Sequence, residues 1–251
     1  MSRRGQSSLT VAVARPPPIT RLYRSCEPLE SLRPDDPRWV DFDEVRGEEN
    51  VVALYARSLR RAMPDRPDLK LFAGHRGVGK TSELYRLRQM LEAGESDSRG
   101  FIVVMCDAAA RLDVNDLDFP DLLVFVAAQL QEQLAERELR GFSPFTTYLK
   151  RVWDDIRDLL GSEVELKSAE IDVAFVKLAT ELRNRPNARR ELRDAIESHS
   201  TSLLNAVNDL LRAAETAAVN EGYLGLVLII DGLDKLVRRE LEGGGNTHDR
   251  L

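Results

Sequence analysis

The residues with the most specific chemistry form the run GHRGVGKT, from Gly74 to Thr81, which fits the pattern G-x-x-x-x-G-K-[ST] in full. Its glycines let the backbone curl so that successive amides converge on phosphate oxygens, next to the positive end of a helix dipole. The ammonium group of Lys80 suits the β- and γ-phosphates, and the Thr81 hydroxyl is a ligand for Mg²⁺. The predicted nucleotide-binding residues are Gly74, Gly77, Val78, Gly79, Lys80, Thr81 and Ser82.

A second chemical signal is the apolar run Leu226–Ile230, which ends in Asp231. A buried strand delivers such a carboxylate to the edge of a parallel sheet where α/β proteins bind ligands. We therefore predict that Asp231, with Thr81, holds magnesium. Gly232 cannot supply a base, so Asp234 is the better candidate for orienting an attacking water. Its alternative role is the N-cap of a helix that begins at Lys235.

The elements that must position these residues alternate between helix and strand. A short strand, Leu69–Ala73, precedes the glycine run, and an amphipathic helix follows it to about Ala93. A strand that is apolar on both faces is typical of the interior of a parallel sheet. Further strands are predicted at 101–106 and 224–230, and further helices at 48–62, from Asp118 and at 188–219. The alternation predicts a three-layer α/β fold with a mostly parallel sheet.

The predicted organisation is a flexible arm over residues 1–40 and a nucleotide-binding domain over 41–251. Three consecutive prolines at 16–18 favour an extended arm, and Pro34 and Pro37 make residues 21–47 irregular. An insertion at about 140–200 has no assigned role. It is predicted to hold a helix at 145–160 and, at 163–178, either a β-hairpin or a continuous helix.

Composition narrows the class of protein. The chain has 251 residues, of which 43% are hydrophobic and 31% charged, as in folded globular proteins. Its net charge of −6 provides no overall basic field for nucleic acid. No stretch approaches the roughly 20 apolar residues of a membrane span. We expect a cytoplasmic protein with free thiols at Cys26 and Cys106 and no zinc site.

These motifs resemble those of P-loop ATPases of the AAA-like and STAND group. Gly74–Thr81 is similar to their Walker A motif, and Ile229–Asp234 to the Asp-Gly-Leu-Asp form of Walker B. Val45–Glu48 resembles the Gly-Arg-Glu-type element that lies near the base and ribose, although Arg here precedes Gly. The resemblance covers roughly residues 42–240. It implies ATP and Mg²⁺ as ligands and a role in bacterial signalling or conflict response.

One departure from this group concerns the sheet. Its usual strand order is 5-1-4-3-2, but only Gly232–Leu251 follow the second motif, and they are charged or glycine-rich. No fourth or fifth strand, arginine finger or helical lid is predicted there. We expect the chain to be the N-terminal part of such a domain, with a protein partner or self-association through the missing regions. It should be poorly stable alone, and a cooperative melt above about 50 °C would contradict this.

Three functions remain open at this point. The first is an ATPase whose nucleotide state switches a larger assembly, and the second is a nucleotide-binding module with little hydrolysis. The third is a DNA-linked regulatory ATPase. The support for this third function is a cluster of arginines, although such a cluster is usually a solvated helix face. Its members are Arg183, Arg185, Arg189, Arg190 and Arg193. The absence of a guanine-specifying Asn-Lys-x-Asp motif favours ATP over GTP.

Overall fold

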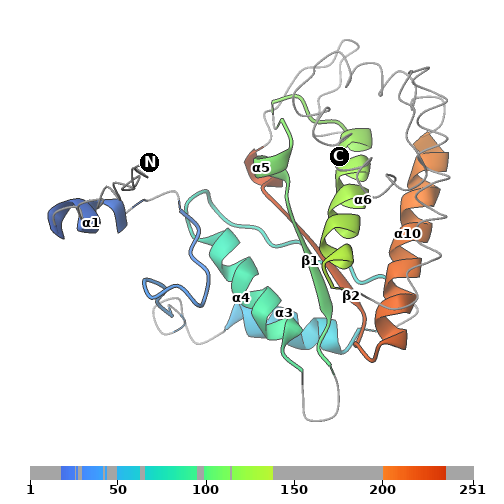
Figure 1. The fold of residues 1–251 in the computed structure, drawn as a ribbon, viewed down its shortest axis with the longest axis horizontal. Helices are drawn as coiled ribbons and strands as arrows, with labels where there is room; N and C mark the ends of the chain where they lie inside the picture. The colour runs from blue at the N-terminus through green and yellow to red at the C-terminus, as the bar shows by residue number, and fades with distance from the viewer. Residues whose placement is uncertain are drawn as a thin grey trace, which may run out of the picture.

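The computed structural model describes residues 18–25, 27, 30–41, 43, 50–62, 66–94, 99–113, 115–137 and 200–235. Two parallel strands lie at its centre, with helices on both sides (Figure 1). The strands are β1 (Ile102–Asp107) and β2 (Leu226–Asp231), and a 3-10 turn, η2, covers Leu233–Lys235. The helices are α1 (Pro18–Ser25), α3 (Val51–Arg60), α4 (Lys80–Glu92), α5 (Ala108–Arg111), α6 (Phe119–Ala135) and α10 (Ser200–Asn220).

The parallel pairing of β1 and β2 brings their carboxyl ends together. The register pairs Ile102 with Leu226 at one end and Asp107 with Asp231 at the other. Parallel strands need a long crossover between them, and residues 108–225 supply it. The prediction of an α/β fold with a parallel sheet is therefore confirmed for the two strands that the structure describes.

Alternate residues of the strands face two separate cores. Val103 and Ile229 pack with buried residues of α3 and α4, such as Val52 and Leu87. On the opposite face, residues of β1 pack with α6 and α10 in a larger cluster that includes Ile102, Val104, Cys106, Phe125, Leu130 and Leu210. This arrangement gives three layers of helix, sheet and helix in the described part of the chain.

Local signals explain where two of the helices begin. The Asn50 side chain accepts a hydrogen bond from Ala53 N at 2.8 Å and caps α3. At α6, the Asp118 side chain accepts from Phe119 N, while Asp118 N donates to the Asp121 carboxylate at 3.0 Å. The Asp118 side chain also accepts from the backbone amide of Asp121, which completes a capping box, and Pro120 lies in the first turn of the helix, where it costs no hydrogen bond.

A side chain closes the edge of β1 that faces away from β2. Gln133, on α6, accepts a hydrogen bond from Met105 N at 3.0 Å and donates one to Met105 O at 2.8 Å. Its amide thus takes the place of a neighbouring strand for one residue. Exposed sheet edges are otherwise free to pair with other chains, so the contact protects the middle of this edge.

The prediction of a strand at Leu69–Ala73 is wrong for this structure, in which the segment is neither helix nor strand and belongs to no sheet. A strand needs a neighbour for its backbone amides and carbonyls, and no strand among the described residues pairs with it. Leu69 and Leu71 are 95% and 83% exposed. Tyr55 Oη donates a hydrogen bond to the Leu71 carbonyl at 2.6 Å.

The structure also differs near the N-terminus, where an extended or irregular segment is predicted and α1 is found instead. Pro18 occupies the first turn of α1, where its fixed backbone angle suits a helix and its missing amide hydrogen is not needed. The prediction that Pro34 and Pro37 keep their segment irregular is confirmed for residues 30–41, which contain turns but no helix or strand, whereas Asp43 is helical.

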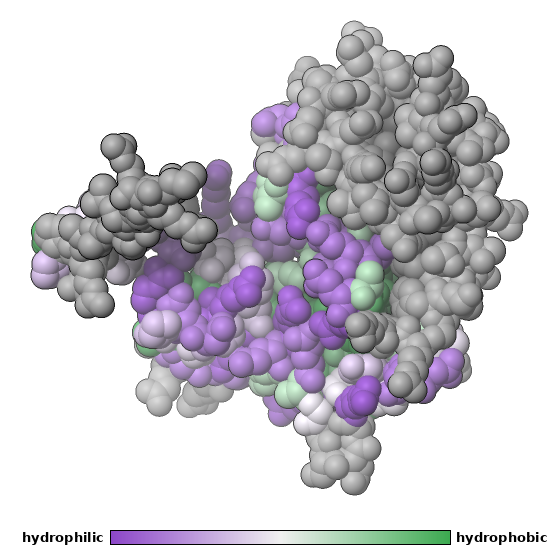
Figure 2. All heavy atoms as spheres, in the orientation of Figure 1, coloured by the Kyte–Doolittle hydropathy of each residue, from purple (hydrophilic) through white to green (hydrophobic). Residues whose placement is uncertain are grey.

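Several predictions concern residues outside the described ranges. They include the helix at 145–160, the hairpin at 163–178, the first part of the helix at 188–219, the arginine cluster, Cys26 and the element Val45–Glu48. Within the described ranges, Cys106 is a buried free thiol, as predicted. None of the described helices is long and apolar enough to cross a membrane. The visible surface of the described residues is mostly hydrophilic, with smaller hydrophobic patches (Figure 2).

Candidate functional site

The glycine run forms an exposed loop that leads directly into α4. Gly77 and Gly79 both have φ near +84°, a region that residues with a side chain rarely adopt. Gly79 is the N-cap of α4 and Lys80 its first residue. The backbone amides of the first helical turn lack partners within the helix and make the N-terminus attractive to anions. The loop therefore places two left-handed glycines directly before a helix N-terminus.

The Thr81 side chain meets the end of β2. Thr81 Oγ1 donates a hydrogen bond to Asp231 Oδ2 at 2.7 Å, across 150 positions of sequence. The Asp231 residue is 8% exposed, so its carboxylate is largely removed from water. Threonine and aspartate oxygens are suitable ligands for a hard cation, and Mg²⁺ in proteins is often held by one or two such groups together with water and phosphate.

The Lys80 side chain turns back over its own loop. Its ammonium group donates to the carbonyls of Gly74 and His75 at 3.0 and 3.1 Å. It also forms an ion pair with Asp234 Oδ2 at 2.7 Å. The hydrogen bond from Lys80 lowers the pKa of the Asp234 carboxyl below its ordinary value. The Asp234 carboxyl is therefore ionised at neutral pH and faces the Lys80 ammonium at 2.7 Å.

A glycine is required between the two aspartates for a steric reason. Gly232 has φ +85°, and a Cβ built there would lie 2.8 Å from Ala109 Cβ and 2.9 Å from Ala109 N. The close approach of α5 thus excludes a glutamate directly after Asp231. This agrees with the prediction that position 232 supplies no base, and the chain then turns through η2 to place Asp234 beside Lys80.

A network of charged side chains ties α4 to the segment that precedes α3. Arg86 on α4 donates to both carboxylate oxygens of Asp43, at 2.7 and 2.6 Å, and to Asp41 at 3.2 Å. Asn50, the cap of α3, also donates to Asp43. The guanidinium lies 5.6 Å from the ring centre of Trp39. Such bidentate pairs fix geometry, so this network holds the helix that carries Lys80 and Thr81 in place.

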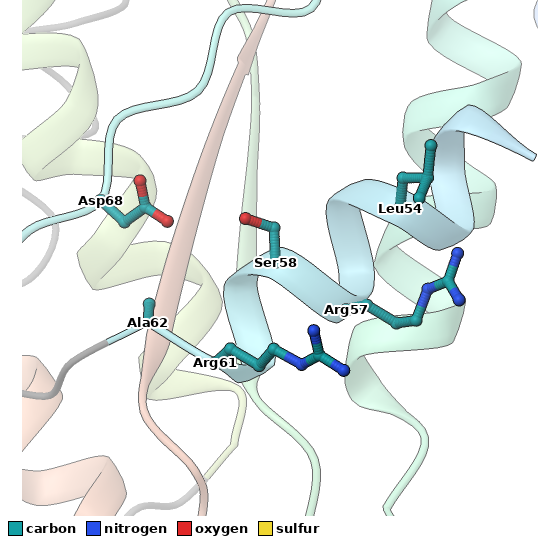
Figure 3. A pocket seen from close by; sticks show the side chains of 6 residues that line it. All are labelled: Leu54, Arg57, Ser58, Arg61, Ala62 and Asp68. Atoms are coloured by element: carbon teal, nitrogen blue, oxygen red, sulfur yellow. The ribbon is translucent and has the colours of Figure 1, made fainter.

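An open pocket lies elsewhere, along one side of α3. In Figure 3, the side chains of Arg57 and Arg61 extend to one side of the helix, and Asp68 lies across from them on the following segment. Leu54, Ser58 and Ala62 complete its lining. None of these residues belongs to the glycine run or to the end of β2. A phosphate loop binds through backbone amides at an exposed surface, so the two sites need not coincide.

The structure brings together most of the predicted site residues. Lys80 and Thr81 contact Asp234 and Asp231, respectively, while Gly74, Gly77, Val78 and Gly79 form the exposed loop. Ser82 is half-buried in the first turn of α4. Among the described residues, no cluster of three or more His, Cys, Asp or Glu side chains could hold a metal ion. A magnesium ion here would therefore depend on Thr81, Asp231, water and phosphate.

Two parts of the site were not predicted. The Lys80–Asp234 ion pair was not predicted. Its sequence signal is the spacing of Asp231 and Asp234, which lets the two aspartates contact the adjacent residues Thr81 and Lys80. The Arg86 network was also missed, and its sequence signal is weak, because charged pairs distant in sequence carry no periodicity. No protein-family model, curated protein or solved structure was found to match this chain.

Proposed function

We propose that this chain is a P-loop nucleotide-binding protein of the AAA-like and STAND type, which binds ATP with Mg²⁺ and works as a nucleotide-controlled switch. The observation that carries the proposal is the hydrogen bond of 2.7 Å between Thr81 and Asp231. A chance glycine turn before a helix has no reason to meet an acidic strand end 150 positions away. A site for a metal bound to a phosphate needs these two oxygens close together.

Three further features support the proposal. The loop has left-handed glycines at Gly77 and Gly79 directly before a helix N-terminus. The acidic residue lies at the carboxyl end of a parallel strand, where α/β sheets bind ligands. The strands β1 and β2 are neighbours, as the second and third strands are in the order 5-1-4-3-2.

Each residue of the site then has a defined role. The loop amides and Lys80 would bind the phosphates, with the lysine as a compact cation. Thr81 and Asp231 would hold Mg²⁺, which supplies positive charge against the phosphate oxygens. Asp234 would orient water for attack on the γ-phosphate, provided that it leaves Lys80. A signalling role and a larger assembly follow from the family resemblance.

A second candidate function is nucleotide binding with little hydrolysis. The observation in its favour is that Asp234, the group available for orienting water, is paired with Lys80 at 2.7 Å. Measuring phosphate release alongside binding separates the two functions. A protein that binds Mg·ATP but releases phosphate at the rate of the Lys80→Ala variant belongs to this second class.

The experiment that tests the proposed metal site compares two aspartates at the same register. Asp231→Asn and Asp107→Asn each remove one carboxylate from a strand end. Asp231 contacts Thr81, whereas Asp107 accepts a hydrogen bond from Ala110 N at 2.9 Å and caps α5, so Asp107→Asn is the control. ATP affinity is measured by calorimetry with Mg²⁺ and with EDTA. We expect Asp231→Asn to lose the Mg²⁺-dependent gain in affinity and Asp107→Asn to retain it. Equal behaviour of the two variants would contradict the assignment.

A further inference from the structure

The contacts of Lys80 have a consequence for how a phosphate can enter the loop. A lysine ammonium has three hydrogens to donate. The Lys80 ammonium contacts three acceptors, which are the carbonyls of Gly74 and His75 and the carboxylate of Asp234. A phosphate can reach this ammonium only if at least one of these contacts is given up. The two carbonyls belong to the loop itself, whereas the carboxylate comes from a separate element, η2.

Of the three acceptors, the Asp234 carboxylate is the one that an incoming phosphate repels most strongly. Phosphate and carboxylate are both anions, and like charges that share one cation at hydrogen-bond distance repel each other. The Asp234 side chain is 36% exposed and lies on a single turn, so it has room to move toward water. The Lys80 side chain is only 13% exposed and is held by its loop. Asp234 is therefore the partner that leaves.

We propose that Asp234 is an internal competitor for phosphate, an autoinhibitory contact that holds Lys80 until a nucleotide displaces it. This inference rests on the proposed function, because it assumes that the loop from Gly74 to Thr81 binds nucleotide. It adds a regulatory step to that function. Nucleotide entry breaks the Lys80–Asp234 pair and frees η2 from α4. The same release makes the Asp234 carboxylate available to water, so that hydrolysis follows binding.

The position of η2 connects this step to the rest of the fold. The turn contacts α5 and follows β2 directly, and Asp231 in β2 accepts the hydrogen bond from Thr81. The two aspartates thus hold adjacent residues at the start of α4. Loss of one contact leaves the other in place. Displacement of Asp234 can therefore shift η2 without separating the loop from the sheet.

The test measures Mg·ADP affinity by calorimetry, because ADP is not turned over during the titration. The variants are Asp234→Asn, which removes the charge, and Asp234→Ser, which removes the charge but retains a side chain that can cap a helix. The matched control is Asp209→Asn on α10, which removes one carboxylate from a pair with Arg212. Each variant is also melted without nucleotide. The Lys80→Ala variant shows whether binding occurs at the loop.

Both Asp234 variants are expected to bind Mg·ADP roughly two- to fivefold more tightly than the parent, the range that an exposed ion pair supports. Without nucleotide, their melting temperature should fall by about 1–3 °C. The control should match the parent in affinity. A purely structural role for Asp234 predicts lower stability together with equal or weaker binding.

The outcomes separate this inference from the proposed function. Equal or weaker binding by both Asp234 variants, with binding by the parent that Lys80→Ala abolishes, overturns the competitor role and leaves the nucleotide site intact. Absence of Mg·ADP and Mg·ATP binding by a folded parent overturns both. If one Asp234 variant does not fold, the other decides the result.

Discussion

The strands β1 and β2 have similar apolar sequences but different surroundings. In β1, Ile102, Val103, Val104 and Cys106 are fully buried, and Gln133 closes part of the outer edge. In β2, most residues are only half-buried. The segment before the glycine run is more exposed still, although it is also apolar. An apolar strand sequence therefore does not determine burial by itself, because helices or further strands must be present to cover it.

This comparison also separates stability from chemistry. The large core lies between β1, α6 and α10. The charged and glycine-rich site lies at the end of β2 and the start of α4, where residues 74–78 and the Asp234 side chain are exposed. Substitutions in the core should change stability most, and substitutions of the charged side chains of the site should change binding with smaller effects on stability.

The largest expected effect on stability comes from Phe125 on α6, which is 1% exposed. We expect Phe125→Ala to lower the free energy of unfolding by about 3–5 kcal/mol, because it creates a cavity in the larger core. Leu71→Ala, at a residue that is 83% exposed, should change it by less than about 0.5 kcal/mol. Urea denaturation measures both. A large effect at Leu71 would show that the segment before the loop is packed in solution.

Gly232 and Gly222 offer a matched pair for backbone strain. Both have positive φ, +85° and +82°, but a Cβ at Gly232 would meet Ala109, whereas nothing lies within 4 Å at Gly222. Gly222→Ala should cost about 1 kcal/mol from the backbone alone. Gly232→Ala should cost roughly 1–3 kcal/mol more from overpacking against α5. Equal costs, measured by urea denaturation, would mean that α5 lies farther from β2 than the structure has it.

The edge contact of β1 should make a smaller contribution. Gln133→Leu leaves the amide and carbonyl of Met105 without their recorded side-chain partner. We expect a loss of about 1–3 kcal/mol, the cost of unsatisfied buried polar groups. Gln89→Leu, at an exposed position of α4, serves as the control and should be nearly neutral. An unchanged urea midpoint for Gln133→Leu would show that water replaces the glutamine at this edge.

The smallest effect concerns pH and the buried thiol of Cys106. Burial raises the pKa of this thiol to about 12, above its ordinary value of about 8.5 in unfolded chains. The folded state therefore holds the thiol proton more tightly than the unfolded state does. The contribution of this proton to the free energy of unfolding is complete below about pH 8.5 and is lost as the pH rises toward 12. In a Cys26→Ser background, native protein at pH 8 should not react with a thiol reagent until it unfolds. Rapid labelling of native protein would contradict the burial.

The sequence predicted those features that depend on local chemistry. The helix start at Asp118, the helix after the glycine run and the strands at 101–106 and 224–230 all carry local signals, and all are found within a few residues of the expected bounds. The prediction that Thr81 and Asp231 share one magnesium ion requires them to lie close together, and the structure places them in direct contact.

The features that were not predicted depend on distant neighbours. Leu69–Ala73 has the composition of a strand, but a strand also needs a partner, which composition cannot supply. The contact of Gln133 with Met105 and that of Arg86 with Asp43 join segments far apart in sequence. Pro18 indicated a break in structure, and its position at the start of a helix depends on the residues that follow it.

The central claim is that the loop from Gly74 to Thr81 binds nucleotide. The most direct measurement is calorimetric titration of the full chain with Mg·ATP, beside Lys80→Ala and the control Lys70→Ala, an exposed lysine paired with Asp68. We predict binding by the parent and the control, and loss of binding in Lys80→Ala with its circular dichroism unchanged. Absence of binding by the folded parent, or equal affinity in all three proteins, would contradict the account.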